Sequence, residues 1–332
     1  MSTLAVIGAG SWGTALAKTL SPRFDDVKLW ARDGALADCL NSQRENTRYL
    51  PGVHVPDNVF ASSELATVLS GSSVVLSVVP ARYTRGVYER MRPFVTSRMC
   101  FVSATKGIEN ETLLCMSEVI SEVISPEFRP RVAVLSGPTF AKEVAADEPA
   151  ALVIASEDAA LASTLQSEFA RSTFRLYTSS DVRGVELGAA LKNVIALGAG
   201  MCQGLGLGGN SVAALVTRGL AEITRLAVAL GASPRTLSGL AGLGDLVLTC
   251  TGDLSRNRSV GIQLASGKPL EQVLSGMNQV AEGVHTCRAA RDLARRCAID
   301  MPITEQMYEI LYHAQPVRAA IQQLMERPLT SE

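Results

Sequence analysis

A glycine-rich turn near the start of this 332-residue chain constrains its fold more than any other feature. Residues 4–7 form an apolar run that predicts a short strand, and residues 11–20 have helical spacing. Gly8, Gly10 and Gly13 lie between them as G-x-G-x-x-G. In a dinucleotide-binding turn the first glycine permits the tight bend, the second lets the backbone approach a pyrophosphate, and the third allows close packing of helix on strand. The N-terminus of the helix then faces the phosphates. We expect such a turn here, a purely structural glycine turn being the alternative.

Apolar runs and helical patterns alternate over the first half of the chain. Residues 62–69 predict a serine-capped helix. Further strands are predicted at residues 27–30, 73–79, 100–105, 131–135, 151–155 and 174–178. Strands that are apolar on both faces and separated by helices indicate a mostly parallel sheet covered on both sides. The fold class is therefore α/β, with a Rossmann-like N-terminal domain.

The pattern changes after about residue 180, where strand signals nearly vanish. Helices are predicted at residues 182–202, 211–230, 234–241, 258–266, 270–275, 284–298, 303–313 and 316–326. We therefore expect a dinucleotide-binding domain over residues 1–180, followed by an all-helical domain for substrate and catalysis over residues 181–332.

Composition excludes several classes of function. The chain has 31 basic and 32 acidic residues, so its charge gives no reason to expect nucleic acid or a membrane surface as a partner. His54, His285 and His313 are scattered without metal-ligand spacing, so no metal site is expected. No charged and apolar leader precedes the first strand, and the apolar stretch at residues 187–201 contains a lysine and an asparagine. A cytoplasmic protein without stable membrane association is the expectation.

The end of the second predicted strand bears on the choice of cofactor. An acidic residue there holds a ribose 2′-hydroxyl, whereas an arginine accommodates a 2′-phosphate. The chain has Arg32 followed by Asp33, so both choices have a candidate. We expect NADPH or NADH, with Arg32 favouring NADPH; an ordinary solvated arginine is the alternative.

Polar residues follow other predicted strands. Lys106 stands beside Gly107 after one strand, and Ser136, Gly137 and Thr139 follow the next. Open parallel sheets bind ligands beyond the carboxyl ends of their strands. Taken together, these residues predict a crevice for a small anionic or polyhydroxylic substrate, although each alone is an ordinary loop residue.

A lysine interrupts the most apolar stretch of the second half. Lys192 and Asn193 lie in a helical pattern that is otherwise apolar on all faces, which indicates a buried helix. Burial lowers the pKa of a lysine and suits it to proton transfer near neutral pH. The alternative is a lysine whose ammonium group reaches the surface; the adjacent asparagine favours a residue that lines a crevice.

A phosphate-binding group is predicted between residues 242 and 261. Gly244 and Asp245 precede the run Ser255, Arg256, Asn257. Hydroxyl, guanidinium and amide groups can converge on a phosphate, and Ser255 at a helix N-terminus would add backbone N–H groups. A capped helix with solvated arginines is the equal alternative.

These motifs together resemble bacterial NAD(P)-dependent glycerol-3-phosphate dehydrogenase over the whole length of the chain. The matching segments are GAGSWGTALA, SATKGIE, LSGPTFAKEV, ELGAALKNVIALGAG, AGLGDLVLTCTG, SRNR and VAEGVHT. The resemblance implies reduction of dihydroxyacetone phosphate to sn-glycerol 3-phosphate, the backbone of membrane phospholipids, by a homodimeric enzyme.

The resemblance also implies roles for individual residues. Lys192 would be the catalytic acid and base. Cofactor contacts would come from the glycine turn and from Ser11, Trp12, Arg32, Lys106, Ala141, Arg256, Val280 and Glu282. Substrate contacts would come from Lys106, Gly137, Thr139, Lys192, Asp245, Ser255, Arg256 and Asn257. Asp245 would orient Lys192, and Lys106 would stabilise charge on the carbonyl oxygen.

Two other functions fit parts of the sequence. A dehydrogenase acting on a β-hydroxyacid would need a carboxylate-binding set and would not need the group at residues 255–257. A dinucleotide sensor without turnover would leave Lys192 in its apolar helix unexplained.

Overall fold

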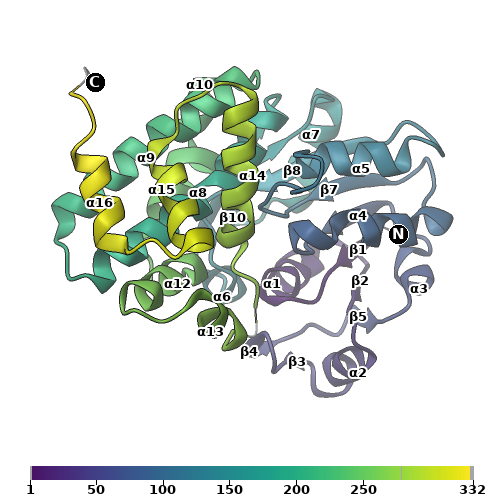
Figure 1. Ribbon diagram of the computed structural model, residues 1–332. Coiled ribbons are helices and arrows are strands. Elements are labelled where there is room, and N and C mark those ends of the chain that lie inside the picture. Colours follow the sequence, from purple (N-terminus) through teal and green to yellow (C-terminus); the bar gives the residue numbers. More distant parts are fainter. Residues whose placement is uncertain (1, 278, 330–332) are drawn as a thin grey trace.

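The computed structural model describes residues 2–277 and 279–329 as a sheet domain joined to a helical domain, with the termini at opposite ends of the molecule (Figure 1). The sheet has the order β10-β9-β8-β7-β6-β1-β2-β5. All neighbours are parallel except β8 and β9, which are antiparallel. The prediction of a mostly parallel, Rossmann-like sheet is confirmed.

The strands of this sheet are short. They are β1 (Thr3–Ile7), β2 (Asp26–Trp30), β5 (Val59–Ser62), β6 (Val74–Ser77), β7 (Cys100–Ser103), β8 (Arg131–Ser136), β9 (Ala150–Ala155) and β10 (Phe174–Ser179). A separate hairpin comprises β3 (Glu45–Asn46) and β4 (Leu50–His54).

Helices cover both faces of the sheet. One face packs against α1 (Ser11–Leu20), α2 (Gly34–Gln43) and α7 (Ala159–Phe169). The other face packs against α3 (Leu65–Leu69), α4 (Ala81–Met91) and α5 (Met116–Ile124). Alternate residues of β1 show why its sequence is apolar throughout: Leu4 and Val6 join the first core, and Ala5 and Ile7 join the second.

The serine cap predicted for the helix at residues 62–69 is wrong. The helix α3 begins at Leu65 after Glu64, and no side chain caps it. Ser62 belongs to β5, and its hydroxyl accepts a hydrogen bond from the Glu64 N–H (3.1 Å) in the preceding turn. The serine therefore stabilises the turn into the helix and not the helix itself.

Among the described residues, every element after residue 180 is helical. These are α8 (Val182–Gly204), α9 (Gly209–Ala229), α10 (Pro234–Leu237), the π-helical turn η3 (Leu240–Gly244), α11 (Asp245–Thr251), α12 (Arg256–Ala265), α13 (Leu270–Ser275), α14 (Glu282–Arg296), α15 (Pro302–His313) and α16 (Val317–Met325). The short helices α6 (Ala141–Ala145), η1 (Ser21–Arg23) and η2 (Arg92–Phe94) lie in the sheet domain.

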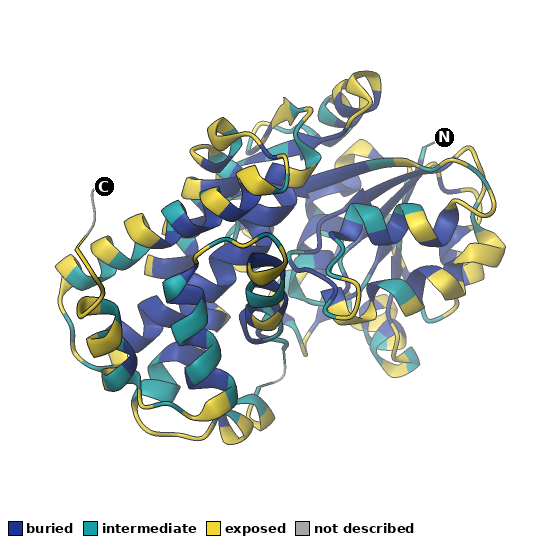
Figure 2. Ribbon diagram, turned by 45° about the horizontal axis from the view of Figure 1, so that its top comes forward, coloured by how far each residue is buried: buried dark blue, intermediate teal, exposed yellow. Residues whose placement is uncertain are grey.

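The long helix α8 is the centre of the helical domain. It is buried from Gly184 to Cys202, and Figure 2 shows buried helical segments at the centre of the helical domain. By length and composition it could cross a membrane, but 94% of its most apolar window is buried inside this fold. Its apolar character therefore follows from its place in the core.

Glycines let other helices approach α8 closely. A Cβ atom on Gly200 would lie 1.9 Å from the Arg258 carbonyl oxygen, and one on Gly261 would lie 2.0 Å from the Leu197 carbonyl oxygen. The backbones of α8 and α12 therefore touch. This contact fixes the start of α12 relative to the middle of α8.

We predict that Gly261→Ala separates α8 from α12 and lowers the free energy of unfolding by about 3 kcal/mol, the upper part of the range for overpacked sites. Urea unfolding followed by circular dichroism measures the change. The matched control is Gly209→Ala at the start of α9, where a Cβ atom would meet nothing within 4 Å. Equal stability of both variants would contradict the close contact.

Candidate functional site

The glycine turn between β1 and α1 has the shape that a pyrophosphate requires. Gly8 has a φ of +120°, and a Cβ atom there would lie 2.9 Å from the Val78 carbonyl oxygen. At Gly13 a Cβ atom would lie 1.8 Å from the Gly8 carbonyl oxygen, so α1 packs directly on the turn. At Gly10 it would meet no protein atom within 4 Å, so the space beside Gly10 is open to a ligand. The turn therefore fits a dinucleotide.

The N-terminus of α1 adds binding groups to this turn. Gly10 is the residue before the helix and has no side chain to cap it, so the first N–H groups remain available to phosphates. Trp12 and Ala141 pack together in a small apolar cluster beside the turn, which places the start of α6 there. The Ser11 hydroxyl donates to Gln279 Oε1 (3.1 Å) from the segment before α14.

Arg32 lies where the sequence places a group for the 2′-position of the cofactor. It follows β2, is exposed, and makes no hydrogen bond or ion pair with any described residue. Asp33 is already engaged, because its carboxylate caps α2 through the Ala35 N–H (3.1 Å) and lies 3.4 Å from Arg48 Nη1. The free cation at the end of β2 favours a phosphate over a hydroxyl. Arg48 is a second cation at this place, which sequence reasoning missed.

Two lysines share one buried carboxylate where the two domains meet. Lys106, after β7, donates to Asp245 Oδ2 (2.8 Å), and Lys192 of α8 donates to Asp245 Oδ1. Asp245 has no exposed surface, and Lys192 is 4% exposed. The predicted pairing of Asp245 with Lys192 is present in the structure, together with a bond to Lys106.

Lys106 also reaches the loop after β8. Its ammonium group donates to the Gly137 carbonyl oxygen (3.0 Å) and lies 3.4 Å from the Thr139 hydroxyl. Gly137 has a φ of +154°, and a Cβ atom there would lie 2.8 Å from Leu152 Cα, so only glycine fits between the strands. The predicted strand-end residues Lys106, Gly137 and Thr139 are thus brought together.

The environment of Lys192 favours its neutral form. Burial lowers the pKa of Lys192 to about 7, and the Lys106 cation acts in the same direction, while Asp245 opposes the shift. The Thr249 hydroxyl accepts a hydrogen bond from Lys192 (2.7 Å) and donates to the Asp245 carbonyl oxygen (2.6 Å). Two of the three ammonium protons are therefore engaged, and one remains for a ligand.

Sequence reasoning missed Thr249. It lies on α11, a helix that the sequence analysis did not predict, one turn after Asp245. The four-residue spacing of Asp245 and Thr249 was the available signal, because it places both side chains on one helix face.

The start of α12 lies beside the middle of α8. Ser255 caps α12 by accepting from the Arg258 N–H (3.3 Å), as the sequence predicts. The Asn257 side chain donates to Asn193 Oδ1 (2.9 Å) and accepts from the Gly283 N–H (3.0 Å), so it joins α12, α8 and α14. The uncapped N–H groups of Arg256 and Asn257 lie in the first turn of α12 and can bind an anion.

Arg256, Val280 and Glu282 form the connection to α14. Arg256 is exposed, and its Nη1 donates to the Val280 carbonyl oxygen (3.0 Å). Glu282 accepts from the Ala81 N–H (3.1 Å) of α4 in the other domain. Residues of both domains therefore surround the space between the glycine turn and Lys192.

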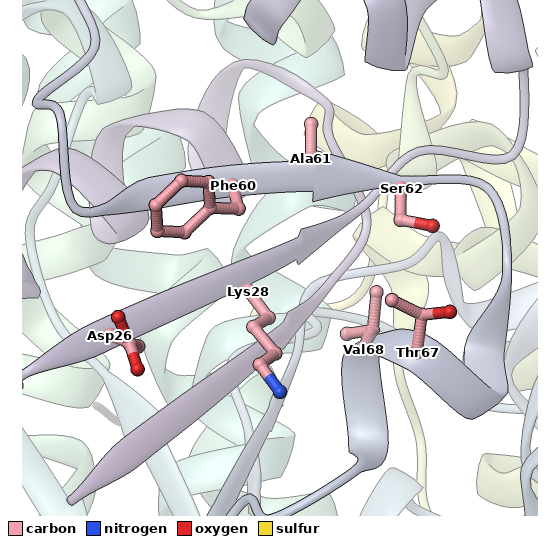
Figure 3. A pocket seen from close by; sticks show the side chains of 7 residues that line it. All are labelled: Asp26, Lys28, Phe60, Ala61, Ser62, Thr67 and Val68. Atoms are coloured by element: carbon pink, nitrogen blue, oxygen red, sulfur yellow. The ribbon is translucent and has the colours of Figure 1, made fainter. Parts of the chain in front are cut away.

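A surface hollow lies elsewhere on the sheet, away from these residues. Figure 3 shows its lining residues on β2, β5 and α3: Asp26, Lys28, Phe60, Ala61, Ser62, Thr67 and Val68. Lys28 already donates to the Ser70 carbonyl oxygen (2.6 Å), and the hollow includes none of the predicted site residues.

Comparison with known proteins identifies the family. The model described as the N-terminus of NAD-dependent glycerol-3-phosphate dehydrogenase matches residues 3–162, and the model for the C-terminus matches residues 181–322. The chain belongs to this family. The resemblance inferred from the sequence motifs is confirmed.

Similar proteins extend over the full length of the chain. A glycerol-3-phosphate dehydrogenase (NAD(P)+) from Koribacter versatilis is 53% identical, with 100% of this chain and 99% of that protein covered. One of the same name from Syntrophotalea carbinolica is 52% identical, with 99% of each covered. The crystal structure of glycerol-3-phosphate dehydrogenase from Coxiella burnetii is 38% identical, with a TM-score of 0.94 over 98% of this chain and 99% of that one.

More distant structures share the fold alone. A ketopantoate reductase from Ralstonia eutropha is 18% identical, with a TM-score of 0.62 over 98% of this chain and all of that one. The fold is therefore shared by a protein outside the family.

Proposed function

We propose that the chain reduces dihydroxyacetone phosphate to sn-glycerol 3-phosphate with NADPH or NADH, with a preference for NADPH. The observation that carries this proposal is the cluster in which Lys106 and Lys192 share Asp245 at the junction of the two domains. The names of the full-length relatives support the same reaction. We also propose that the product supplies phospholipid synthesis, and that the protein is a cytoplasmic homodimer.

The sheet domain binds the cofactor and the helical domain supplies the catalytic residue in the proposed reaction. Residues 1–180 hold the dinucleotide through Gly8, Gly10, Gly13 and the start of α1, with Ser11, Trp12, Arg32 and Ala141 around them. Residues 181–332 supply Lys192 and the start of α12. The space between the domains then receives the substrate, with its phosphate on Ser255, Arg256 and Asn257.

The nicotinamide supplies hydride to the carbonyl carbon when the cofactor is bound. The residues of the chain handle the charge and proton that follow. Lys192 gives its remaining proton to the carbonyl oxygen, Lys106 stabilises the negative charge on that oxygen, and Asp245 holds both ammonium groups in place. Fixing the phosphate at α12 sets the position of the carbonyl group.

The two alternative functions require different groups in the site. A β-hydroxyacid dehydrogenase needs a group that binds a carboxylate and does not need the start of α12 for a phosphate. A dinucleotide sensor without turnover has no use for a buried ammonium with a lowered pKa. Oxidation of NADPH and NADH, followed by absorbance with dihydroxyacetone phosphate and with β-keto acids, separates these functions. Turnover only with the keto acids would contradict the proposal.

Arg32→Ala should weaken binding of NADPH more than binding of NADH, because only NADPH carries the 2′-phosphate that the exposed guanidinium meets. Fluorescence titration with each cofactor gives the two dissociation constants. Arg98→Ala, at an exposed position before β7, is the control for loss of one positive charge. Equal weakening of both cofactors by Arg32→Ala, or no weakening, would contradict this role.

Arg256→Ala should raise KM for dihydroxyacetone phosphate sharply, because the start of α12 loses its guanidinium. Unphosphorylated dihydroxyacetone, which lacks the group that Arg256 binds, should be affected far less. Steady-state kinetics with both substrates measures the difference. A matching loss for both would instead indicate that the bond from Arg256 to Val280 is structural.

Lys192→Met should fold and bind NADPH, but its turnover should fall by roughly two to four orders of magnitude, the usual contribution of general acid catalysis. Methionine keeps much of the buried stem and removes the proton donor, while Lys106 still neutralises Asp245. Stopped-flow measurement of hydride transfer, with a cofactor titration to show binding, tests this. Near-normal turnover in the folded variant would overturn the mechanism.

The pH dependence of the reaction should follow Lys192. Reduction needs its protonated form, so the rate should fall as pH rises above the lowered pKa of about 7. Oxidation of glycerol 3-phosphate needs the neutral amine, so its rate should rise over the same range. Single-turnover measurements in both directions give the two profiles. Profiles that change in the same direction would contradict the assignment.

A further inference from the structure

Three basic residues lie near the place where the first turns of α4 and α14 come together. The two helices touch through the bond from the Ala81 N–H to Glu282 (3.1 Å). Arg82 follows Ala81, and its Nη1 lies 3.3 Å from His285 Nε2 on α14. Arg288 lies three residues beyond His285 and therefore on the same face of that helix.

The contact between Arg82 and His285 sets the protonation of the imidazole. A guanidinium group only donates, so a hydrogen bond between Arg82 and His285 requires an unprotonated Nε2 and a neutral ring. Burial lowers the pKa of His285, and the charges of Arg82 and Arg288 act in the same direction. A protonated imidazole would face a guanidinium at 3.3 Å, and an anion that accepts hydrogen bonds from both groups would stabilise this pair.

Three other arginines on these two helices have carboxylate partners, whereas Arg90 lies over the Trp30 ring (5.6 Å). Arg85 on α4 pairs with Glu109 and Glu122, and Arg291 and Arg295 on α14 pair with Glu305. In the part of the chain that the structure describes, Arg82 and Arg288 have no carboxylate within ion-pair distance. They lie instead over the rings of Tyr83 (4.6 Å) and Tyr312 (4.8 Å).

Two carboxylates near His285 offset part of this positive charge. Glu282, one turn before His285, accepts from the Ala81 N–H and interacts electrostatically with Arg82 and Arg256. Asp292 lies one turn beyond Arg288. The charges of both residues act on the pKa of the Tyr312 hydroxyl, in opposite directions. The N-termini of α4 and α14 add the positive ends of two helix dipoles at the same place.

We propose that Arg82, His285 and Arg288 bind a phosphate dianion, either free inorganic phosphate or the phosphate group of a small monoester. The two guanidinium groups donate to its oxygens, and His285 takes up a proton and becomes a third donor. This site uses none of the residues assigned to the substrate or the cofactor. A bound phosphate would join α4 of the sheet domain to α14 of the helical domain.

Calorimetric titration of the full chain with inorganic phosphate at low ionic strength tests the site. The Arg82→Gln/Arg288→Gln variant should bind phosphate roughly tenfold more weakly at this site, from the loss of charged hydrogen bonds. Its matched control is Arg295→Gln/Arg296→Gln on α14, which removes the same charge at exposed positions. Thermal unfolding of each variant verifies that it is folded.

Two further variants separate this site from its neighbours. Arg256→Gln disables the proposed substrate phosphate group, and phosphate should still bind to Arg82, His285 and Arg288. His285→Gln should remove the uptake of a proton, measured as the dependence of the binding enthalpy on buffer ionisation. Because the readout is phosphate binding and not turnover, failure of the proposed reaction would leave this result unchanged.

The phosphate titrations have results that support the site and results that overturn it. Equal weakening by the two double variants would show unspecific attraction to positive charge and overturn the proposal, as would loss of all phosphate binding in Arg256→Gln. A second titration with glycerol 3-phosphate, in the Arg256→Gln background, identifies the source. Equal affinity supports recognition of phosphate itself, and tighter binding of glycerol 3-phosphate supports a site for the product.

Discussion

The burial of α8 is the constraint on which the rest of the structure depends. A lysine in the middle of a fully buried helix is costly unless a partner balances its charge. Asp245, without exposed surface, provides that balance for Lys192. Asp245 must therefore lie on an element that packs directly against α8. Helix α11, which carries Asp245, does so. A Cβ atom on Gly188 of α8 would lie 2.7 Å from the Ala241 carbonyl oxygen, so the turn leading into α11 also touches the helix backbone.

The same carboxylate connects the two domains at the point where chemistry is proposed. Asp245 holds Lys192 through one oxygen and Lys106 through the other, and Lys106 follows a strand of the sheet. Two ammonium groups on one carboxylate leave a net positive charge when both are protonated. That charge suits an oxyanion, and it also makes loss of the Lys192 proton easier. The lysine pair thus contributes to both binding and acidity, while burial of Lys192 is the larger cause of its lowered pKa.

The sequence predicts those parts of the fold that local pattern determines. The glycine turn, the apolar strands and the buried helix around Lys192 each carry their signal within about twenty residues. The helix α11 was missed because its sequence reads as part of a glycine-rich loop, and its burial depends on α8, some fifty residues away. The serine cap at Ser62 was wrong because pairing of β5 with β2 extends to that residue. The contacts of Asn257 with Asn193 and Gly283 could not be predicted, since they join three helices through tertiary packing.

Several contacts between the domains are polar and lie around the proposed ligand space. Lys106 bonds Asp245, Ala81 bonds Glu282, and Gln279 reaches both Ser11 and the Tyr49 carbonyl oxygen. Polar contacts of this kind exchange with water and ligand groups at small net cost, unlike buried apolar surface. A dinucleotide at the glycine turn would meet Ser11 and its partner Gln279, and a substrate at Lys192 would meet the lysine pair. The groups that join the domains are therefore also those that the ligands engage, so binding and the relative position of the domains are coupled through the same hydrogen bonds.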